Sequence, residues 1–391
     1  MEAPKNRDLS ILLHIVFFVS GIATVLIGQV LPILSSGFAL NDLQAGFFFP
    51  AQFSGSIIGT VVSNWFGRCS KFALATVVGC VLMATGMTMM NLISFAGCLT
   101  GFFVTGLGIG MTLPSVNLLI LEMNPQEGAS ALSVLNFCWG LGAILCKPFV
   151  DATATKGSVF ITTVILVLPL ITCASLIILL PREPETAAPE PTVATTGQVA
   201  AIWTTALAWT IALFNFVQVG FESGIGGWLT TYAGRVQGEA VIQLVSPTFL
   251  YFLFFVAGRG IAPLYFRFMS ENQVLFLDIG LMFAGMLLIL SAGDLTWLSV
   301  GAAVAGFGAS SVFPTNLSRF TRTFGSTATR RATPLFVCGT LGGATVTWLI
   351  GFVSNQTASL RTGMFTLFAC VLVVAVIQIL LILSDTIRNN E

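Results

Sequence analysis

The stretch "GLGIGMTLPSVN" at residues 106–117 has a near copy in "GFGASSVFPTN" at residues 306–316. Both contain two glycines separated by one residue, and both place a proline eight residues after the first glycine. Small residues are common wherever membrane helices pack, so one shared pattern is a weak sign of duplication. The decisive question is whether other stretches repeat in the same register.

Three further pairs of stretches repeat at an offset of 199 or 200 residues. The matching positions are Gly21 and Gly220, Gly28 and Gly227, Gly59 and Gly258, Arg68 and Arg267, Cys138 and Cys338, and Gly142 and Gly342. Four stretches in one register indicate an internal duplication rather than a chance match.

The composition places the chain in a lipid bilayer. Of its 391 residues, 55% are apolar and only 8% are charged, whereas soluble domains carry about 25% charged residues. The charges balance at 16 basic and 16 acidic residues with no basic run, which argues against nucleic acid as a partner. The eight cysteines occur singly, so neither a disulfide framework nor a metal site is expected.

Twelve apolar runs are each long enough to span a bilayer, which predicts an all-α membrane protein. The runs lie at 10–34, 43–66, 72–92, 95–121, 130–150, 158–180, 198–232, 240–266, 273–292, 296–319, 331–352 and 362–385. They leave no room for a soluble catalytic domain, and the chain has neither a P-loop nor a readable nucleophile and base, so we expect no enzyme.

The polar segment at 181–198, "PREPETAAPEPTVATTGQ", separates the runs into two sets of six. Its Pro, Glu and Thr content is typical of a solvated linker. We therefore predict a six-helix bundle at 1–180, a cytoplasmic linker and a second bundle at 199–391. Twelve of the 16 Lys and Arg residues fall on the side of the two termini, which predicts that both termini are cytoplasmic.

Two six-span repeats of the same orientation, joined by a central linker, resemble the plan of the major facilitator transporters. The stretch "GTVVSNWFGRCSK" at 59–71 is similar to the motif that follows span two in that family, with Asn64 at the motif's acidic position. The stretches "GFESGIGGWLTTY" at 220–232 and "GRGIAPLYFRFMSE" at 258–271 resemble the fucose permease branch.

The resemblance implies a monomeric inner-membrane protein of bacteria that needs no bound cofactor. It would carry a monosaccharide or similar polar solute with protons or sodium by alternating access. The acidic residues that fucose permeases place on helices one and four correspond here to Gly28 and Met111, so coupling through that pair is not carried over.

Glu222 is the strongest candidate for substrate binding and ion coupling. It lies in a long apolar run, with Asn215 and Gln218 on nearly the same helical face and Trp228 following. Ionisable residues inside a membrane usually mark a functional site, and a carboxylate there can exchange protons, bind sodium or accept from sugar hydroxyls. The structural alternative is a carboxylate held by a neighbouring helix or placed at the outer interface.

Four further polar or aromatic residues are candidates for lining the substrate path: Asn117, Asn136, Trp139 and Asn316. An amide suits a sugar hydroxyl because it both donates and accepts, and an indole packs against the C–H face of a pyranose. The alternative is that the amides join helices and Trp139 fills space.

The candidate gating residues are Lys147, Arg68, Arg259 and Arg267. Lys147 and Glu222 come from different halves at similar depth, so an ion pair between them could latch the outer side; the alternative is that Lys147 reaches to the membrane surface. Asp278 falls on span nine, where a structural partner or the same reach to the surface is expected.

Two other functions remain open on the sequence. An apolar chain with 34 Phe residues would also suit an exporter of amphipathic compounds. A membrane sensor that retains the fold without transport is the third possibility.

Overall fold

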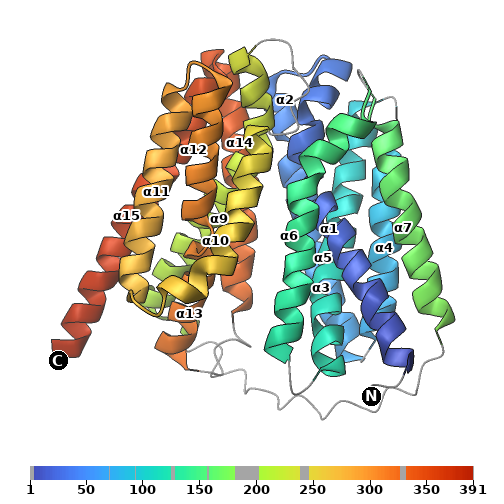
Figure 1. Cartoon of the computed structure of the whole chain (residues 1–391), viewed down its shortest axis with the longest axis horizontal. Helices are drawn as coiled ribbons and strands as arrows, with labels where there is room; N and C mark the ends of the chain where they lie inside the picture. The colour runs from blue at the N-terminus through green and yellow to red at the C-terminus, as the bar shows by residue number, and fades with distance from the viewer. Residues whose placement is uncertain are drawn as a thin grey trace. The chain divides into compact units, whose positions relative to one another are not determined.

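The structure is a computed structural model that describes residues 4–390, except 70, 93, 125–127, 156–157, 181–201, 238–245 and 326–331. The described chain is helical and contains no strand beyond one isolated bridge between Thr155 and Ser158. It divides into two compact units, Met1–Pro191 and Thr192–Glu391 (Figure 1). The predicted linker at 181–198 lies outside the described residues.

The described part of the first unit contains six long helices and one short one. They are α1 (Pro4–Gly37), α2 (Asp42–Gly46), α3 (Phe48–Arg68), α4 (Phe72–Met89), α5 (Phe95–Met123), α6 (Gly128–Thr153) and α7 (Phe160–Leu179). The short α2 carries a capping box, in which Asn41 and Gln44 each satisfy a backbone N–H of the other.

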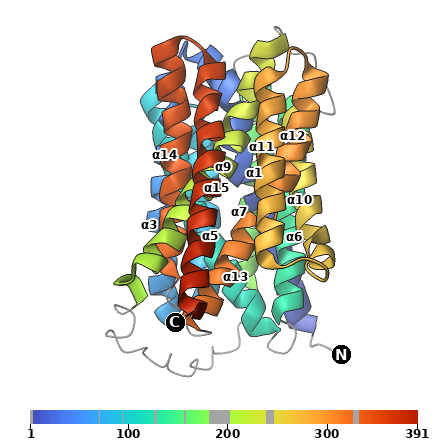
Figure 2. The same cartoon turned by 90° about the vertical axis from the view of Figure 1, so that its left-hand side faces the viewer.

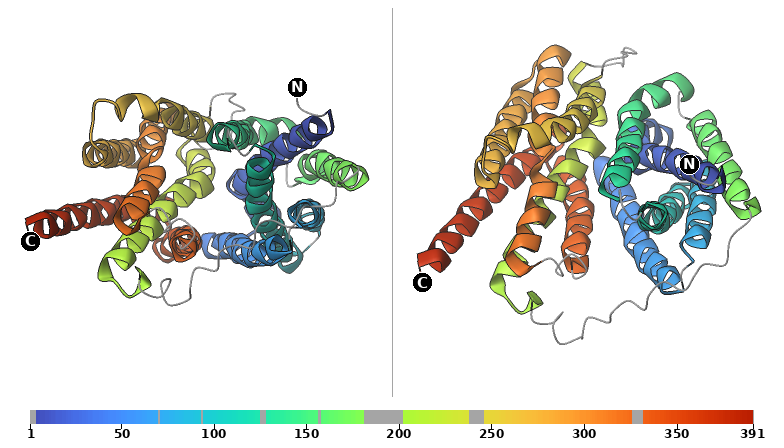
Figure 3. Two further views of the ribbon diagram at one scale, coloured as in Figure 1. Left: turned by 90° about the horizontal axis from the view of Figure 1, so that it is seen from below. Right: turned by 60° about the horizontal axis from the view of Figure 1, so that its bottom comes forward.

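The second unit contains α9 (Ala206–Gln237), α10 (Pro247–Tyr265), α11 (Glu271–Ser291), α12 (Leu295–Ala309), α13 (Val312–Phe324), α14 (Thr333–Thr357) and α15 (Leu360–Asn390). Figure 2 shows α15 packed against α11 and α14. Viewed along their axes, the helices of each unit form a bundle (Figure 3).

The two units use the same helix pairings, which supports the duplication inferred from sequence. In the first unit α5 packs on α3 and α4, α1 on α6, and α4 on α7. The matching pairs in the second unit are α12 with α10 and α11, α9 with α14, and α11 with α15.

The repeated glycines allow these helices to touch backbone to backbone. A Cβ on Gly106 would lie 1.9 Å from the Gln52 carbonyl oxygen, and a Cβ on Gly306 would lie 2.3 Å from the Tyr251 carbonyl oxygen. Real Cβ atoms do not approach an oxygen so closely, so any side chain at either glycine would push the helices apart. The opening motif is therefore a packing device.

The proline of the motif has different effects in the two units. The first-unit helix α5 continues through Pro114, whereas the corresponding helix of the second unit is interrupted at Ser310 and Ser311, between α12 and α13. Pro314 has no N–H to offer the carbonyl oxygen of Ser310, four residues earlier. The span predicted at 296–319 corresponds to the membrane-spanning segment Leu295–Phe324, which contains this break.

Eleven helical segments of the described chain are long and apolar enough to cross a bilayer, with α2 and α3 counted as one and α12 and α13 counted as one. The 32-residue α9, which corresponds to the seventh predicted span, is not among them. Its apolar run is interrupted by the polar side chains at the centre of the candidate site, Asn215, Gln218 and Glu222. The predicted all-α membrane fold is confirmed.

Candidate functional site

The polar face of α9 brings together the three residues that the sequence placed on it. Gln218 Nε2 donates a hydrogen bond to Glu222 Oε1 at 3.0 Å, across one turn of the helix. Asn215 Nδ2 donates to the carbonyl oxygen of Leu335 on α14 at 2.9 Å. Asn215 and Gln218 are buried, while Glu222 keeps part of its surface exposed. This face therefore has a buried amide wall with a half-buried glutamate at one end.

Several buried oxygen atoms of the second unit have no hydrogen-bond partner among the described residues. They are Asn215 Oδ1, Gln218 Oε1, Asn316 Oδ1 and the hydroxyl oxygen of Tyr251. A buried polar atom without a partner costs about 1–3 kcal/mol. These atoms are hydrogen-bond acceptors that a solute rich in O–H groups could satisfy.

Asn316 and Tyr251 reach this region from other helices. Asn316, on α13, donates from Nδ2 to the carbonyl oxygen of Ile211 on α9 at 3.2 Å and is fully buried. Tyr251, on α10, lies close enough to Glu222 for the carboxylate charge to act on its phenol. Sequence reasoning missed Tyr251, because a tyrosine within the aromatic run 249–255 resembles a packing residue.

Among the described residues, Arg259 supplies a positive charge that acts on Glu222. Its guanidinium interacts electrostatically with that carboxylate and stacks 4.1 Å above the ring centre of Phe255. Its Nε also donates to the carbonyl oxygen of Ser310 at 3.1 Å. The sequence placed Arg259 at a cytoplasmic gate, and its role in gating stays a prediction. The structure adds that its charge belongs to the Glu222 environment.

Trp228 has a packing environment. Its side chain is fully buried, and its indole N–H donates to the carbonyl oxygen of Thr347 on α14 at 2.9 Å. In this arrangement the ring joins α9 to α14 and offers no surface to a solute. The predicted contact of Trp228 with substrate would need another arrangement of these helices.

Two of the three first-unit candidates have local hydrogen-bond partners. Asn117 and Asn136 each donate from Nδ2 to the carbonyl oxygen four residues earlier, at 2.8 Å, and Asn136 is exposed on its unit. The indole N–H of Trp139 is buried and has no partner among the described residues. Trp139 also contributes its backbone oxygen to the contact with Gly21, so it has both a packing role and a free donor.

Lys147 is paired with Asp151, one turn further along α6. The proposed latch to Glu222 would require that pair to exchange partners, and the latch stays a prediction. Arg267 is exposed just after α10. Arg68 ends α3, and its side chain is not among those described.

Asp278 does not extend to the membrane surface. It is only 1% exposed, and one of its carboxylate oxygens accepts a hydrogen bond from the hydroxyl of Ser311 at the helix break. The structural partner expected from sequence is therefore Ser311. That serine could not be chosen beforehand, because the break itself was not expected.

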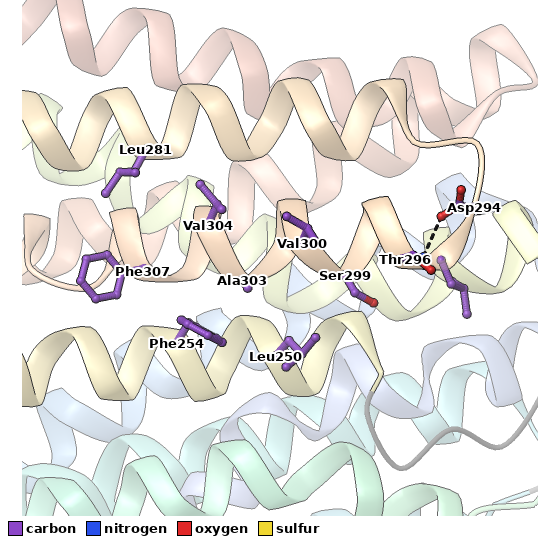
Figure 4. A pocket seen from close by; sticks show the side chains of 11 residues that line it. Leu250, Phe254, Leu281, Asp294, Thr296, Ser299, Val300, Ala303, Val304 and Phe307 are labelled. Carbon is purple, nitrogen blue, oxygen red and sulfur yellow. Dashed lines mark hydrogen bonds between the residues drawn. The ribbon is translucent and has the colours of Figure 1, made fainter.

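A cavity of about 760 Å³ lies elsewhere in the second unit, among α10, α11 and α12 (Figure 4). Aliphatic and aromatic side chains line most of it, and Asp294, which caps α12 through Thr296, lies at one end. None of the candidate site residues lines this cavity. Among the described residues no group of three or more His, Cys, Asp or Glu side chains could hold a metal ion.

Comparison with known proteins identifies relatives over different parts of the chain. Residues 13–345 match the sequence profile of the Major Facilitator Superfamily. The chain is 29% identical to the 4-hydroxybenzoate transporter PcaK of Acinetobacter baylyi over 35% of its length, a match that spans only 31% of that relative. It is 21% identical to the mouse sodium-dependent glucose transporter 1A over 93% of its length and 94% of the relative.

Two solved structures share the fold over nearly the whole chain. A bacterial homologue of the human lysosomal transporter Spinster, in an inward-facing unoccupied conformation, aligns with a TM-score of 0.80 at 14% identity and covers 97% of this chain and 98% of that one. The E. coli fucose:proton symporter FucP aligns with a TM-score of 0.65 at 18% identity over 95% and 98%.

The family match spans most of the chain, and the helical architecture and both structural neighbours agree with it. The predictions of a membrane transporter and of no enzymatic activity are thereby confirmed. The chain belongs to the Major Facilitator Superfamily.

Proposed function

We propose that this protein is an ion-coupled transporter of a monosaccharide or a similar polyhydroxylated solute. It acts by alternating access in the inner membrane of a bacterium, with both termini in the cytoplasm. The observation that carries the proposal is the set of unpartnered buried oxygens around α9, from Asn215, Gln218, Asn316 and Tyr251. A sugar presents several hydroxyl donors in a small volume, which matches several acceptors that lack donors.

Glu222 is the proposed coupling residue. It lies at one end of the amide wall, beside Gln218 and within the electric field of Arg259. A carboxylate in such a position can bind a proton or a sodium ion and can also accept from a solute hydroxyl. Because ion and solute both bind at this one carboxylate, the binding of one raises or lowers the affinity for the other.

The relatives support this class of substrate without fixing it. The names of two of them specify glucose with sodium and fucose with protons. The name of another specifies 4-hydroxybenzoate, an aromatic carboxylate, over a shorter match. An aromatic acid is therefore the competing substrate class. The positive charge of Arg259 would favour binding of its carboxylate.

The test is uptake into proteoliposomes that contain the purified full-length protein. Radiolabelled glucose, fucose, galactose and xylose are compared with 4-hydroxybenzoate and an amphipathic dye, under imposed proton or sodium gradients. We expect one sugar to accumulate above equilibrium under one of the two gradients. Glu222→Gln should abolish accumulation, whereas Glu122→Gln, which alters an exposed carboxylate on α5, should not.

Two results would overturn the proposal. Gradient-driven movement of 4-hydroxybenzoate or the dye, with no sugar transported or competing, would assign a different substrate class. Saturable sugar binding without flux under any gradient would indicate a sensor.

A further inference from the structure

The second unit contains a buried carboxylate that the proposed function does not use. Asp278 lies seven residues into α11, about 10 Å along the helix from its start. Its side chain is 1% exposed and accepts a hydrogen bond from the hydroxyl of Ser311. An ionisable group so placed is costly to keep charged and usually has a function.

Ser311 connects Asp278 to the interruption between α12 and α13. Because Pro314 cannot donate to the carbonyl oxygen of Ser310, that oxygen is free for another donor, and Arg259 Nε takes it at 3.1 Å. Arg259 in turn interacts with Glu222. A continuous polar connection therefore runs from Asp278 through the two serines and Arg259 to the candidate site.

The break is tightly enclosed by its two neighbouring helices. A Cβ on Gly258 of α10 would lie 2.3 Å from the Ser310 hydroxyl oxygen. A Cβ on Gly308, just before the break, would lie 2.7 Å from the backbone oxygen of Asp278. With so little free space, a change in hydrogen bonding at Ser311 must displace neighbouring groups.

The first unit builds the same crossing without these polar groups. Gly108 meets the backbone oxygen of Gly79 there, as Gly308 meets that of Asp278. At the repeat offset, the positions of Asp278, Ser311, Arg259 and Glu222 are filled in the first unit by Gly79, Met111, Thr60 and Ala23. The fold therefore does not require the polar connection, and its presence in one unit only favours a functional role.

The groups that face Asp278 are hydroxyls, so protonation of its own carboxyl is the main change in charge that can occur at this site. The Tyr265 phenol, at the end of α10, is close to the charge of Asp278 and to both serines. Among the described residues of α12, α13 and α15, no charged side chain acts on Asp278. Arg259 reaches the break at Ser310, and other charges lie at the start of α11 and on α13, where Glu271 pairs with Arg322 and Arg319 bonds Asn272 and Gln378.

We propose that Asp278 is a second proton-binding site of this transporter, separate from Glu222 and linked to it through the helix break. The proton comes from water and binds one carboxylate oxygen, with no other chemical change. The ionised acid accepts from Ser311; the protonated acid becomes a donor, so the Ser311 hydroxyl can turn toward a carbonyl oxygen of the break. The role in coupling rests on the proposed function, but the proton site does not.

Infrared difference spectroscopy of the purified full-length protein, titrated from mildly alkaline to acidic pH, tests the site without any substrate. We expect the C=O band of a protonated carboxylic acid that Asp278→Asn removes. Glu222→Gln and Glu271→Gln should leave this band in place. Ser311→Ala should keep the band but shift its frequency, because the acid loses its hydrogen-bond partner.

Asp278→Gly is a second variant that installs the first unit's residue at the same crossing, so it guards against misfolding of the Asn variant. With an identified substrate, both variants should lower proton-driven accumulation about tenfold while exchange across the membrane stays within about twofold of the parent. A tenfold loss of proton-driven accumulation corresponds to a free-energy difference of about 1.4 kcal/mol.

Several outcomes overturn the proposal. An unchanged acid band in both Asp278 variants, or no band at any pH, would mean that Asp278 does not titrate. A band that disappears while accumulation remains unchanged would remove the role in coupling. If no sugar is transported but the Asp278 band is present, the proposed substrate is wrong and the proton site stands.

Discussion

Replacing Gly306 by alanine would put a methyl group 2.3 Å from the carbonyl oxygen of Tyr251. An ordinary C···O contact is about 3.3 Å or longer, so α12 and α10 would have to separate by about 1 Å. A gap of that size forfeits roughly a quarter to a half of the dispersion energy of each affected contact. Overpacking of a tight interface costs about 1–3 kcal/mol.

Alanine also stabilises a helix by about 0.8–1 kcal/mol relative to glycine. The net destabilisation expected for Gly306→Ala therefore lies between about 0 and 2 kcal/mol. The affected unit contains about 200 residues, and for domains of that size 1 kcal/mol lowers Tm by about 2–4 °C. The expected fall in Tm is up to about 8 °C.

A thiol-reactive fluorescent dye provides the assay, since five of the eight free cysteines are buried and become reactive only on unfolding. Gly260→Ala is the matched control, because Gly260 also lies on a helix of this unit and a Cβ there has no atom within 4 Å. It should leave Tm unchanged or raise it. If Gly306→Ala melts at or above the Tm of Gly260→Ala, close backbone contact does not explain the repeated glycines.

Three further outcomes are expected. Trp228→Phe should keep the packing but leave the Thr347 carbonyl without its donor, and lower stability in the same thermal assay by about 0.5–1.5 kcal/mol. Arg259→Lys retains the positive charge near Glu222 but loses the planar Nε donor to Ser310. Initial uptake rates of the identified substrate should therefore fall about tenfold, while the affinity for that substrate changes little. Unchanged uptake rates would contradict the link between Arg259 and the helix break. Glu271→Gln removes an ion pair with the well-exposed Arg322 and should change stability by less than about 1 kcal/mol, with the difference vanishing at high salt.

The sequence predicted those features that depend on periodicity and local spacing. The duplication, the helical spans and the shared face of Asn215, Gln218 and Glu222 follow from offsets along the chain, because helix geometry converts spacing into position. The hydrogen bond between Gln218 and Glu222 is the i, i+4 contact expected from that geometry.

Features that depend on contacts between distant segments could not be predicted. The same glycine and proline pattern gives a continuous helix around Pro114 and an interrupted one before Pro314. The second unit also has Arg259, which lies about 50 residues away and binds the carbonyl that the proline leaves free, and Asp278, which binds Ser311 of the break. The burial of Trp228 likewise depends on α14, more than 100 residues further along the chain.

The proline at the repeated motif has an evolutionary consequence. Each copy of the duplicated helix inherited a backbone oxygen that its own helix cannot satisfy, at Gly110 and at Ser310. Such an oxygen is an unused acceptor present before any side chain had evolved to bind it. In the second copy Arg259 binds this oxygen and links a helix backbone to the charge of Glu222, whereas the first copy has Thr60 at the matching position. A structural by-product of duplication is therefore used in one copy only.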